Sequence, residues 1–207
     1  MIGPLTWSLA QIALSSAEMP PDPYFPPALA TTPLSCRDNG RPMPILSDFE
    51  NGWFSKHLRA AQEPSLYVAA RKPPSGDDFI LRFTWLRTFH APVVIRVEPV
   101  PGGGFRLAAR QLSGAGGYDP GKIAKRVDRA MTAAEVQGLR GVMARNAIFD
   151  QAPANCELGM DGSEWIIEGV DRAGYRFFKR WSPDDGAIRA VGLHLIGLSG
   201  WSFKDVY

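Results

Sequence analysis

Three consecutive segments of the chain alternate between apolar and polar residues, and only short turns separate them. The first, residues 79–90, reads FILRFTWLRTFH and places Arg82 and Phe83 on opposite sides. The alternation continues in residues 92–100 and 104–112, on either side of a glycine-rich turn. A period of two is typical of a strand with one buried face. Strands that are connected by such short links are antiparallel neighbours. The pattern therefore predicts an antiparallel meander.

Residues 164–181 have the pattern of a β-hairpin. Two alternating runs, EWIIEGV and YRFFKRW, flank the turn-compatible sequence DRAG. If Val170 faces Tyr175 across the turn, Trp165 lies opposite Arg180. The same register places Ile167 opposite Phe178, and such cross-strand pairs stabilise a hairpin.

Helices are indicated where capping residues precede apolar runs. The predicted starts are Ser47 with Glu50, Thr132 with Glu135, and Ser182 with Pro183. A capping hydroxyl accepts from the first turn of a helix, whose N–H groups otherwise lack partners. These starts predict helices at residues 47–60, 133–149 and 187–200. Residues 65–70 are predicted as a strand, as are residues 123–131, for which a helix is the alternative.

Composition divides the chain into three parts. Residues 1–17 carry no charged side chain and end in a small-x-small pattern, which resembles a secretory signal peptide, although no Lys or Arg precedes the apolar run. Residues 18–45 hold eight of the 18 prolines and predict an extended leader. Residues 46–207 are expected to form one α+β domain, with an antiparallel sheet (a meander plus a C-terminal hairpin) and about three packed helices.

Charge and cysteine content restrict the function and the compartment. The chain has 23 basic and 21 acidic side chains, a net charge of +2 that gives no reason to expect a nucleic-acid partner. Beyond residues 1–17, no segment has the length and apolarity of a transmembrane helix. Cys36 and Cys156 could form one disulfide in an oxidising compartment; reduced, buried thiols are the alternative. A signal peptide would place the protein in the periplasm or outside the cell, whereas a cytoplasmic protein could keep the segment as an apolar helix.

No motif of catalysis or metal binding is complete. The three histidines are not spaced as metal ligands, so neither a metal nor a cofactor is expected. Residues 116–122 have phosphate-loop spacing, but Ile123 stands where that loop needs Ser or Thr, which favours a plain turn. His90, at the end of a predicted strand, is the candidate acid–base group, with Arg87 nearby. His57 is expected on a solvated helix face.

Basic residues on the polar face of the meander are the main candidates for binding. They are Arg82, Arg96, Arg106 and Arg110. Such a row could bind an anion, an acidic protein or a polyanionic envelope component; the alternative is a solvated face whose arginines lie among acids. Three polar hairpin residues are left without a structural role: Asp161, Arg176 and Arg180. Asp161 could form a carboxylate pair with Glu164 or Glu168, but acids that flank a hairpin are expected to be solvated or ion-paired.

The sequences WFSKHLRAAQEPSL, RFTWLRTFHAPVVIRV and DGSEWIIEGVDRAGYRFFKRWSP resemble a group of uncharacterised, exported bacterial proteins. The resemblance covers most of residues 50–200 and implies one intact domain. It implies no activity, so it assigns no catalytic residue.

These observations together favour a non-enzymatic, exported bacterial protein that binds a protein or an envelope component. A small immunity or inhibitor protein would be one such case, by analogy of size. The first alternative is an enzyme of another family, with an acid–base site near His90. The second is an intracellular structural or interaction protein.

Overall fold

A computed structural model describes residues 22–157 and 159–207 and shows an α+β fold. The apolar segment 1–17 lies outside the described residues. Six antiparallel strands form the main sheet in the order β6-β5-β4-β3-β7-β8, and β1 and β2 form a separate hairpin. The predicted fold class is therefore confirmed, including the three long helices.

The strands and helices follow the chain in a simple order. The hairpin strands are β1 (Pro33–Asp38) and β2 (Arg41–Pro44). The sheet strands are β3 (Ile80–Arg87), β4 (Val93–Pro99), β5 (Phe105–Leu112), β6 (Ile123–Ala130), β7 (Ser163–Asp171) and β8 (Gly174–Trp181). The helices are α1 (Ala28–Thr31), α2 (Asp48–Ala60), α3 (Leu66–Ala69), α4 (Ala133–Arg145), the 3-10 turn η1 (Ile148–Asp150) and α5 (Gly186–Ser199).

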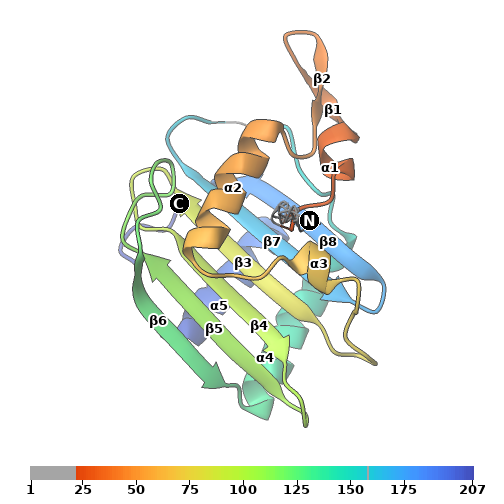
Figure 1. The fold of residues 1–207 in the computed structure, drawn as a ribbon, viewed down its shortest axis with the longest axis vertical. Helices are drawn as coiled ribbons and strands as arrows, with labels where there is room; N and C mark the ends of the chain where they lie inside the picture. The colour runs from red at the N-terminus through yellow and green to blue at the C-terminus, as the bar shows by residue number, and fades with distance from the viewer. Residues whose placement is uncertain (1–21, 158) are drawn as a thin grey trace, which may run out of the picture.

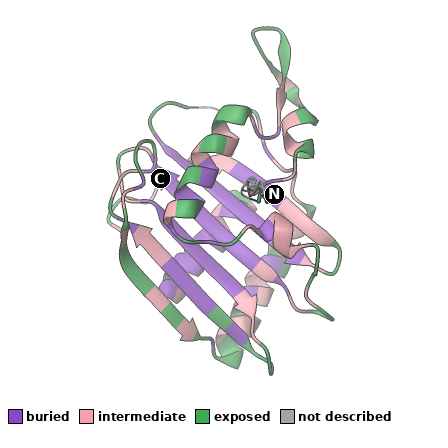
Figure 2. Ribbon diagram, in the orientation of Figure 1, coloured by how far each residue is buried: buried purple, intermediate pink, exposed green. Residues whose placement is uncertain are grey.

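The sheet is the middle of three layers. Figure 1 shows α2 and α3 in front of it and α4 and α5 behind it. The rear core contains the apolar residues of the meander, such as Phe83 and Trp85, packed with Leu195 of α5. The front core joins Phe54 of α2 to Ile166 of β7. Because both faces are covered, the central strands are buried along most of their length, while β6 is an exposed edge (Figure 2).

The C-terminal hairpin has the predicted register. Val170 pairs with Tyr175 and Trp165 pairs with Arg180. Strand β7 then adds to β3, with Trp85 directly opposite Trp165, so the hairpin extends the meander into one sheet. The expected strand at residues 123–131 is also confirmed, as β6.

Two of the three predicted helix starts are confirmed. Ser47 and Thr132 each form a complete capping box with the glutamate three residues later. The third start is wrong, because α5 begins at Gly186 after Asp185. Ser182 instead has a positive φ of 37°, and its hydroxyl accepts from the Ser163 backbone N–H at 2.8 Å. It ends the hairpin rather than beginning the helix.

Two further segments differ from the sequence-based expectation. Residues 65–70 contain the short helix α3 instead of a strand, because the Ser65 hydroxyl caps the backbone N–H of Val68. The described part of the proline-rich segment, from residue 22, is folded instead of being a plain extended leader. It contains α1, the β1–β2 hairpin and the core residue Phe25.

The folded N-terminal segment is also held by a covalent bond. Cys36 on β1 and Cys156, in the loop before β7, form a disulfide with Cα atoms 5.7 Å apart. No helix in residues 22–157 or 159–207 is long and apolar enough to cross a membrane.

Candidate functional site

Six charged side chains of alternating sign cross the front face of the sheet, and they include three arginines of the predicted binding row. In order they are Arg106, Glu98, Arg96, Glu63, Arg82 and Glu168. Glu168 receives two hydrogen bonds of 2.8 Å from Arg82, and Arg96 Nε donates to Glu63 at 2.7 Å. Three arginines thus face three glutamates, which leaves little uncompensated positive charge.

The arginines also differ in their access to solvent. Arg82 and Arg96 are buried, whereas Arg106 is exposed at the edge of this ion-pair network. The fourth arginine, Arg110, lies beside the network and pairs with Asp128 at 2.9 Å. The structure therefore places these side chains among acids, with two of the four covered by protein.

His90 and Arg87 lie at one end of β3, where the last residues of the described chain cover them. His90 Nδ1 is 2.6 Å from the Tyr207 hydroxyl. The Arg87 guanidinium lies over the rings of Trp85 and Phe203, at 4.1 and 4.9 Å from the ring centres. Neither His90 nor Arg87 lines any of the cavities described below.

The three hairpin candidates do not converge on one site. Arg176 pairs with Asp171 at 2.8 Å and lies over the ring of Phe149. Arg180 donates to two backbone carbonyl oxygens. Asp161 is exposed in the loop before β7.

The prediction that His57 is solvated is wrong. Its side chain is fully buried, with Nδ1 2.9 Å from the carbonyl oxygen of Trp53. The loop of residues 113–122 folds over this side of α2, where the Trp53 indole N–H donates to the Gly116 carbonyl at 2.6 Å. Burial accordingly lowers the pKa of the imidazole.

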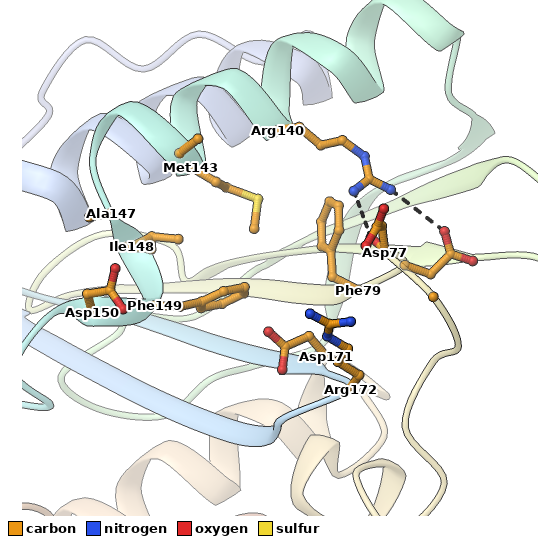
Figure 3. Close-up of a pocket in the computed structure, with 13 residues that line it drawn as sticks. Asp77, Phe79, Arg140, Met143, Ala147, Ile148, Phe149, Asp150, Asp171 and Arg172 are labelled. Atoms are coloured by element: carbon orange, nitrogen blue, oxygen red, sulfur yellow. Dashed lines mark hydrogen bonds and ion pairs between the residues drawn. The ribbon is translucent and has the colours of Figure 1, made fainter.

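One cavity, of about 450 Å³, lies between α4 and the start of β3 (Figure 3). Figure 3 shows Arg140 pointing toward Asp77, with Asp171 on the other side of the opening. Arg140 donates to the Asp77 carbonyl oxygen at 2.7 Å and lies 5.1 Å from the centre of the Phe79 ring. Asp171 is held by Arg176. Arg140 and Asp171 therefore already have protein partners.

A second cavity, of about 620 Å³, contains an acid of a different kind. It lies between the β1–β2 hairpin, the first turns of α2 and the ends of β7 and β8, and we call it the Glu164 cavity. Glu164 is 5% exposed. Its carboxylate has no hydrogen bond or ion pair within the described ranges, although Glu63 and Glu168, the other buried acids there, are both held by arginine.

The surroundings of Glu164 explain why its charge is poorly compensated. Lys179 is the base with the largest effect on the pKa of Glu164, but it pairs with Glu50, whose other oxygen accepts from the Ser47 cap of α2. Burial raises the pKa of the Glu164 carboxyl to about 8; Lys179 and Arg180 oppose this rise, and Glu50 adds to it. A carboxyl with a strongly raised pKa that lines a cavity is a functional-site candidate on physical grounds.

Sequence reasoning missed this site, because it expected the hairpin acids to be solvated or ion-paired. That expectation is correct for Glu168 and wrong for Glu164. A signal was present: Glu164 shares its side of β7 with Ile166 and Val170, so the alternation itself places it on a buried face.

Four exposed apolar side chains lie on neighbouring segments beside the Glu164 cavity, and two of them, Phe89 and Tyr118, are in contact. Four of the five clearly exposed large hydrophobic residues of the described chain form this group, which we call the apolar end: Phe49, Phe89, Tyr118 and Met160. Phe49 stacks on Trp53, which is tied to the loop of residues 113–122, and Phe89 stacks on Tyr118 in that loop. Thr88, next to Phe89, donates to the carbonyl oxygen of Gly162, two residues after Met160.

Within the described ranges, no group of three His, Cys, Asp or Glu side chains is arranged to hold a metal ion. Compared with the models of known protein families and with curated proteins, the chain matches none.

Proposed function

We propose that this chain is a non-enzymatic, exported bacterial binding protein and that it recognises a partner protein through the apolar end. The observation that carries the proposal is that four exposed apolar side chains lie on neighbouring segments at one end of the sheet, with Phe89 and Tyr118 in contact. Single exposed hydrophobic residues are ordinary, but a group of them on one surface is typical of protein–protein interfaces.

The composition of the apolar end favours a protein partner. Its members include Phe, Tyr and Met, which are enriched in the centres of such interfaces. Phe49 lies in α2, and Phe89 and Tyr118 lie in two loops whose backbones are bonded together. Gly116 N donates to the His90 carbonyl at 2.9 Å, and Gly117 N donates to the Thr88 carbonyl at 3.1 Å. A surface fixed in advance loses less conformational entropy on binding.

Two observations support the other parts of the proposal. The disulfide between Cys36 and Cys156 fits an oxidising compartment, which agrees with the signal-like character of residues 1–17. The pairing of the front-face arginines with glutamates argues against a polyanion as the main ligand, because the row offers little free positive charge.

The test is affinity capture from an extract of the source organism, with the whole oxidised chain as bait. The variant Phe89→Ser with Tyr118→Ser removes the apolar character of two exposed side chains without touching the core. Leu193→Ser is the matched control, since Leu193 is exposed on α5 at the opposite face of the sheet. We expect a protein that is captured by the wild type and by the control but lost from the double variant.

Two results would contradict the proposal. Equal capture by the double variant would show that the apolar end is not the binding surface, and captured material without protein would exclude a protein partner. Export is checked separately by mass spectrometry on the native protein: a mature start near residue 18 supports it, and Met1 retained in a cytosolic fraction contradicts it.

A further inference from the structure

The Glu164 cavity combines a carboxylate that lacks a partner with aromatic walls. Three acids line it, Glu164, Glu50 and Asp38, and Arg41 is the only basic residue among its lining residues. The aromatic lining residues are Phe49, Trp53 and Trp181. Trp181 is the direct cross-strand partner of Glu164, so both side chains project from the same face of the hairpin.

Glu164 is the feature that calls for a ligand. It is more than nine-tenths buried, lines the cavity, and has no hydrogen-bond partner among the residues that the structure describes. Its oxygens are not among the enclosed side-chain atoms without a partner, so they are open to the cavity, where a donor from a ligand could reach them. Because the rest of the residue is buried, the ionised form is costly without such a donor. Its neighbour on the same strand, Glu168, shows the usual solution, since it is held by Arg82 and the Tyr175 hydroxyl.

We propose that the Glu164 cavity binds an organic ammonium group, presented either by a lysine side chain or by a free primary amine. An ammonium would donate a charge-assisted hydrogen bond to Glu164, which supplies the missing partner. The faces of aromatic rings attract cations as well, and a desolvated site strengthens that attraction. An anionic ligand is disfavoured, because it would enter beside Glu50 and Asp38.

A cavity of about 620 Å³ is large enough for the alkyl chain that carries such a group. The alkyl chain would lie against the apolar lining, between α2 and the end of β8, while its charged end reaches Glu164. The cavity itself would hold the ammonium group, so binding can be measured with a free amine and without any partner protein.

Binding should release a proton. Burial raises the pKa of Glu164 to about 8, so near pH 7 its carboxyl is mostly protonated. An ammonium favours the ionised form, and the displaced proton leaves to solvent. The charged groups around Glu164 are Lys179, Glu50 and Arg180, with Asp38 and Arg41 elsewhere on the lining. Affinity should therefore rise by roughly tenfold per pH unit between pH 6 and 7.5 and level off above pH 8.

The experiment is calorimetric titration of the whole oxidised chain with n-butylammonium, with n-butanol as the neutral ligand of similar shape. Glu164→Gln keeps the shape of the side chain and removes its charge. Asp161→Asn is the matched control, because it makes the same change of charge three residues away, on an exposed side chain outside the lining of the cavity.

We expect n-butylammonium to bind the wild type and Asp161→Asn with equal affinity. It should bind Glu164→Gln at least tenfold more weakly. Binding to the wild type at pH 7 should release protons. Equal binding to Glu164→Gln, equal binding of n-butanol, or no binding of the amine at pH 8.5 would each overturn the proposal. Glu164→Gln breaks no hydrogen bond or ion pair of the described residues, so its fold should persist, and circular dichroism verifies this.

A second titration distinguishes the two sources of the ammonium group. A five-residue peptide with a central lysine is compared with n-butylammonium, which has the same ammonium group and alkyl chain without a peptide backbone. Tighter binding of the peptide identifies a lysine of a polypeptide as the ligand, and equal affinity identifies a free amine. Failure of these titrations would leave the capture experiment on the apolar end unaffected, because Phe89 and Tyr118 do not line the cavity.

Discussion

Glu164 and Trp181 face each other across the open end of the β7–β8 hairpin, so a buried acid lies beside an aromatic wall of its own cavity. Four residues further along β7, Glu168 occupies the same face and is held by two hydrogen bonds from Arg82. The two acids thus share a strand, a face and a high degree of burial. Glu168 is paired with an arginine and Glu164 is not, so substitutions at Glu164 and at the Arg82–Glu168 pair should change stability in opposite directions.

Glu164→Gln should stabilise the protein at alkaline pH. Burial raises the pKa of the carboxyl from an ordinary 4.5 to about 8, so ionising it in the folded state is unfavourable. The loss of folding stability from ionising Glu164 is absent below about pH 4, grows as the pH rises between the two pKa values, and is complete above about pH 8. At about 1.4 kcal/mol per unit it reaches about 3 to 5 kcal/mol.

Urea unfolding at pH 4 and pH 9 measures this difference. The free energy of unfolding of Glu164→Gln should exceed that of the wild type at pH 9 and match it at pH 4. Asp161→Asn, with its exposed side chain, should show no such dependence on pH. A Glu164→Gln protein no more stable than the wild type at pH 9 would mean that Glu164 ionises without penalty.

Arg82→Met should destabilise the protein strongly. It removes the charge that holds Glu168 and leaves that buried carboxylate uncompensated, which costs about 3 to 5 kcal/mol in comparable pairs. The double variant Arg82→Met with Glu168→Leu removes both charges. It should therefore lose less stability than the sum of the two single changes, as a double-mutant cycle by chemical denaturation would show. Strict additivity would mean that the pair is not coupled.

The two tryptophans of the hairpin should respond differently to truncation. Trp165 is fully buried, with its ring 5.2 and 5.3 Å from those of Phe83 and Trp85, so Trp165→Ala should cost about 3 to 5 kcal/mol. Trp181 is only half-buried at the cavity, and Trp181→Ala should cost less than half as much while weakening the binding of n-butylammonium. Thermal unfolding and calorimetry test the two effects; equal losses of stability would contradict the assignment of Trp181 to the cavity.

The sequence predicted those parts of the fold that depend on local periodicity. The register of β7 with β8 follows from alternation and one turn, and the boxes at Ser47 and Thr132 each involve residues three apart. The start of α5 was not predictable in this way. Ser182 has the composition of a cap, but its hydroxyl is bound by Ser163, which is 19 residues earlier in the chain.

The candidate site depends on contacts that no local pattern records. Arg82 and Glu168 are 86 residues apart, and Glu63 joins them from the segment between α2 and α3. The sequence alone therefore does not show that the row of arginines is paired with acids in the fold. The Glu164 cavity likewise needs the β1–β2 hairpin, whose segment the proline content predicted as an extended leader.

Removing the disulfide should loosen one wall of the Glu164 cavity. Cys36 fixes β1 to the loop at Cys156, and the bond closes a loop of 120 residues. Bonds that close long loops contribute about 2 to 5 kcal/mol, chiefly by restricting the unfolded chain. Cys36→Ser with Cys156→Ser should lower the free energy of unfolding by an amount in this range. It should also weaken the binding of n-butylammonium, because β2 lines the cavity.

Limited trypsin digestion can locate the loosened segment. Arg37 is exposed near the tip of the β1–β2 hairpin, so the double serine variant should be cut after Arg37 first, before the sheet is attacked. Arg41 is followed by Pro42, and trypsin does not cleave that bond. Ser35→Ala, which changes the same strand but keeps the disulfide, should resist cleavage like the wild type. Equal rates of cleavage in all three proteins would show that packing alone holds the hairpin, since the bond would then add nothing to its local stability.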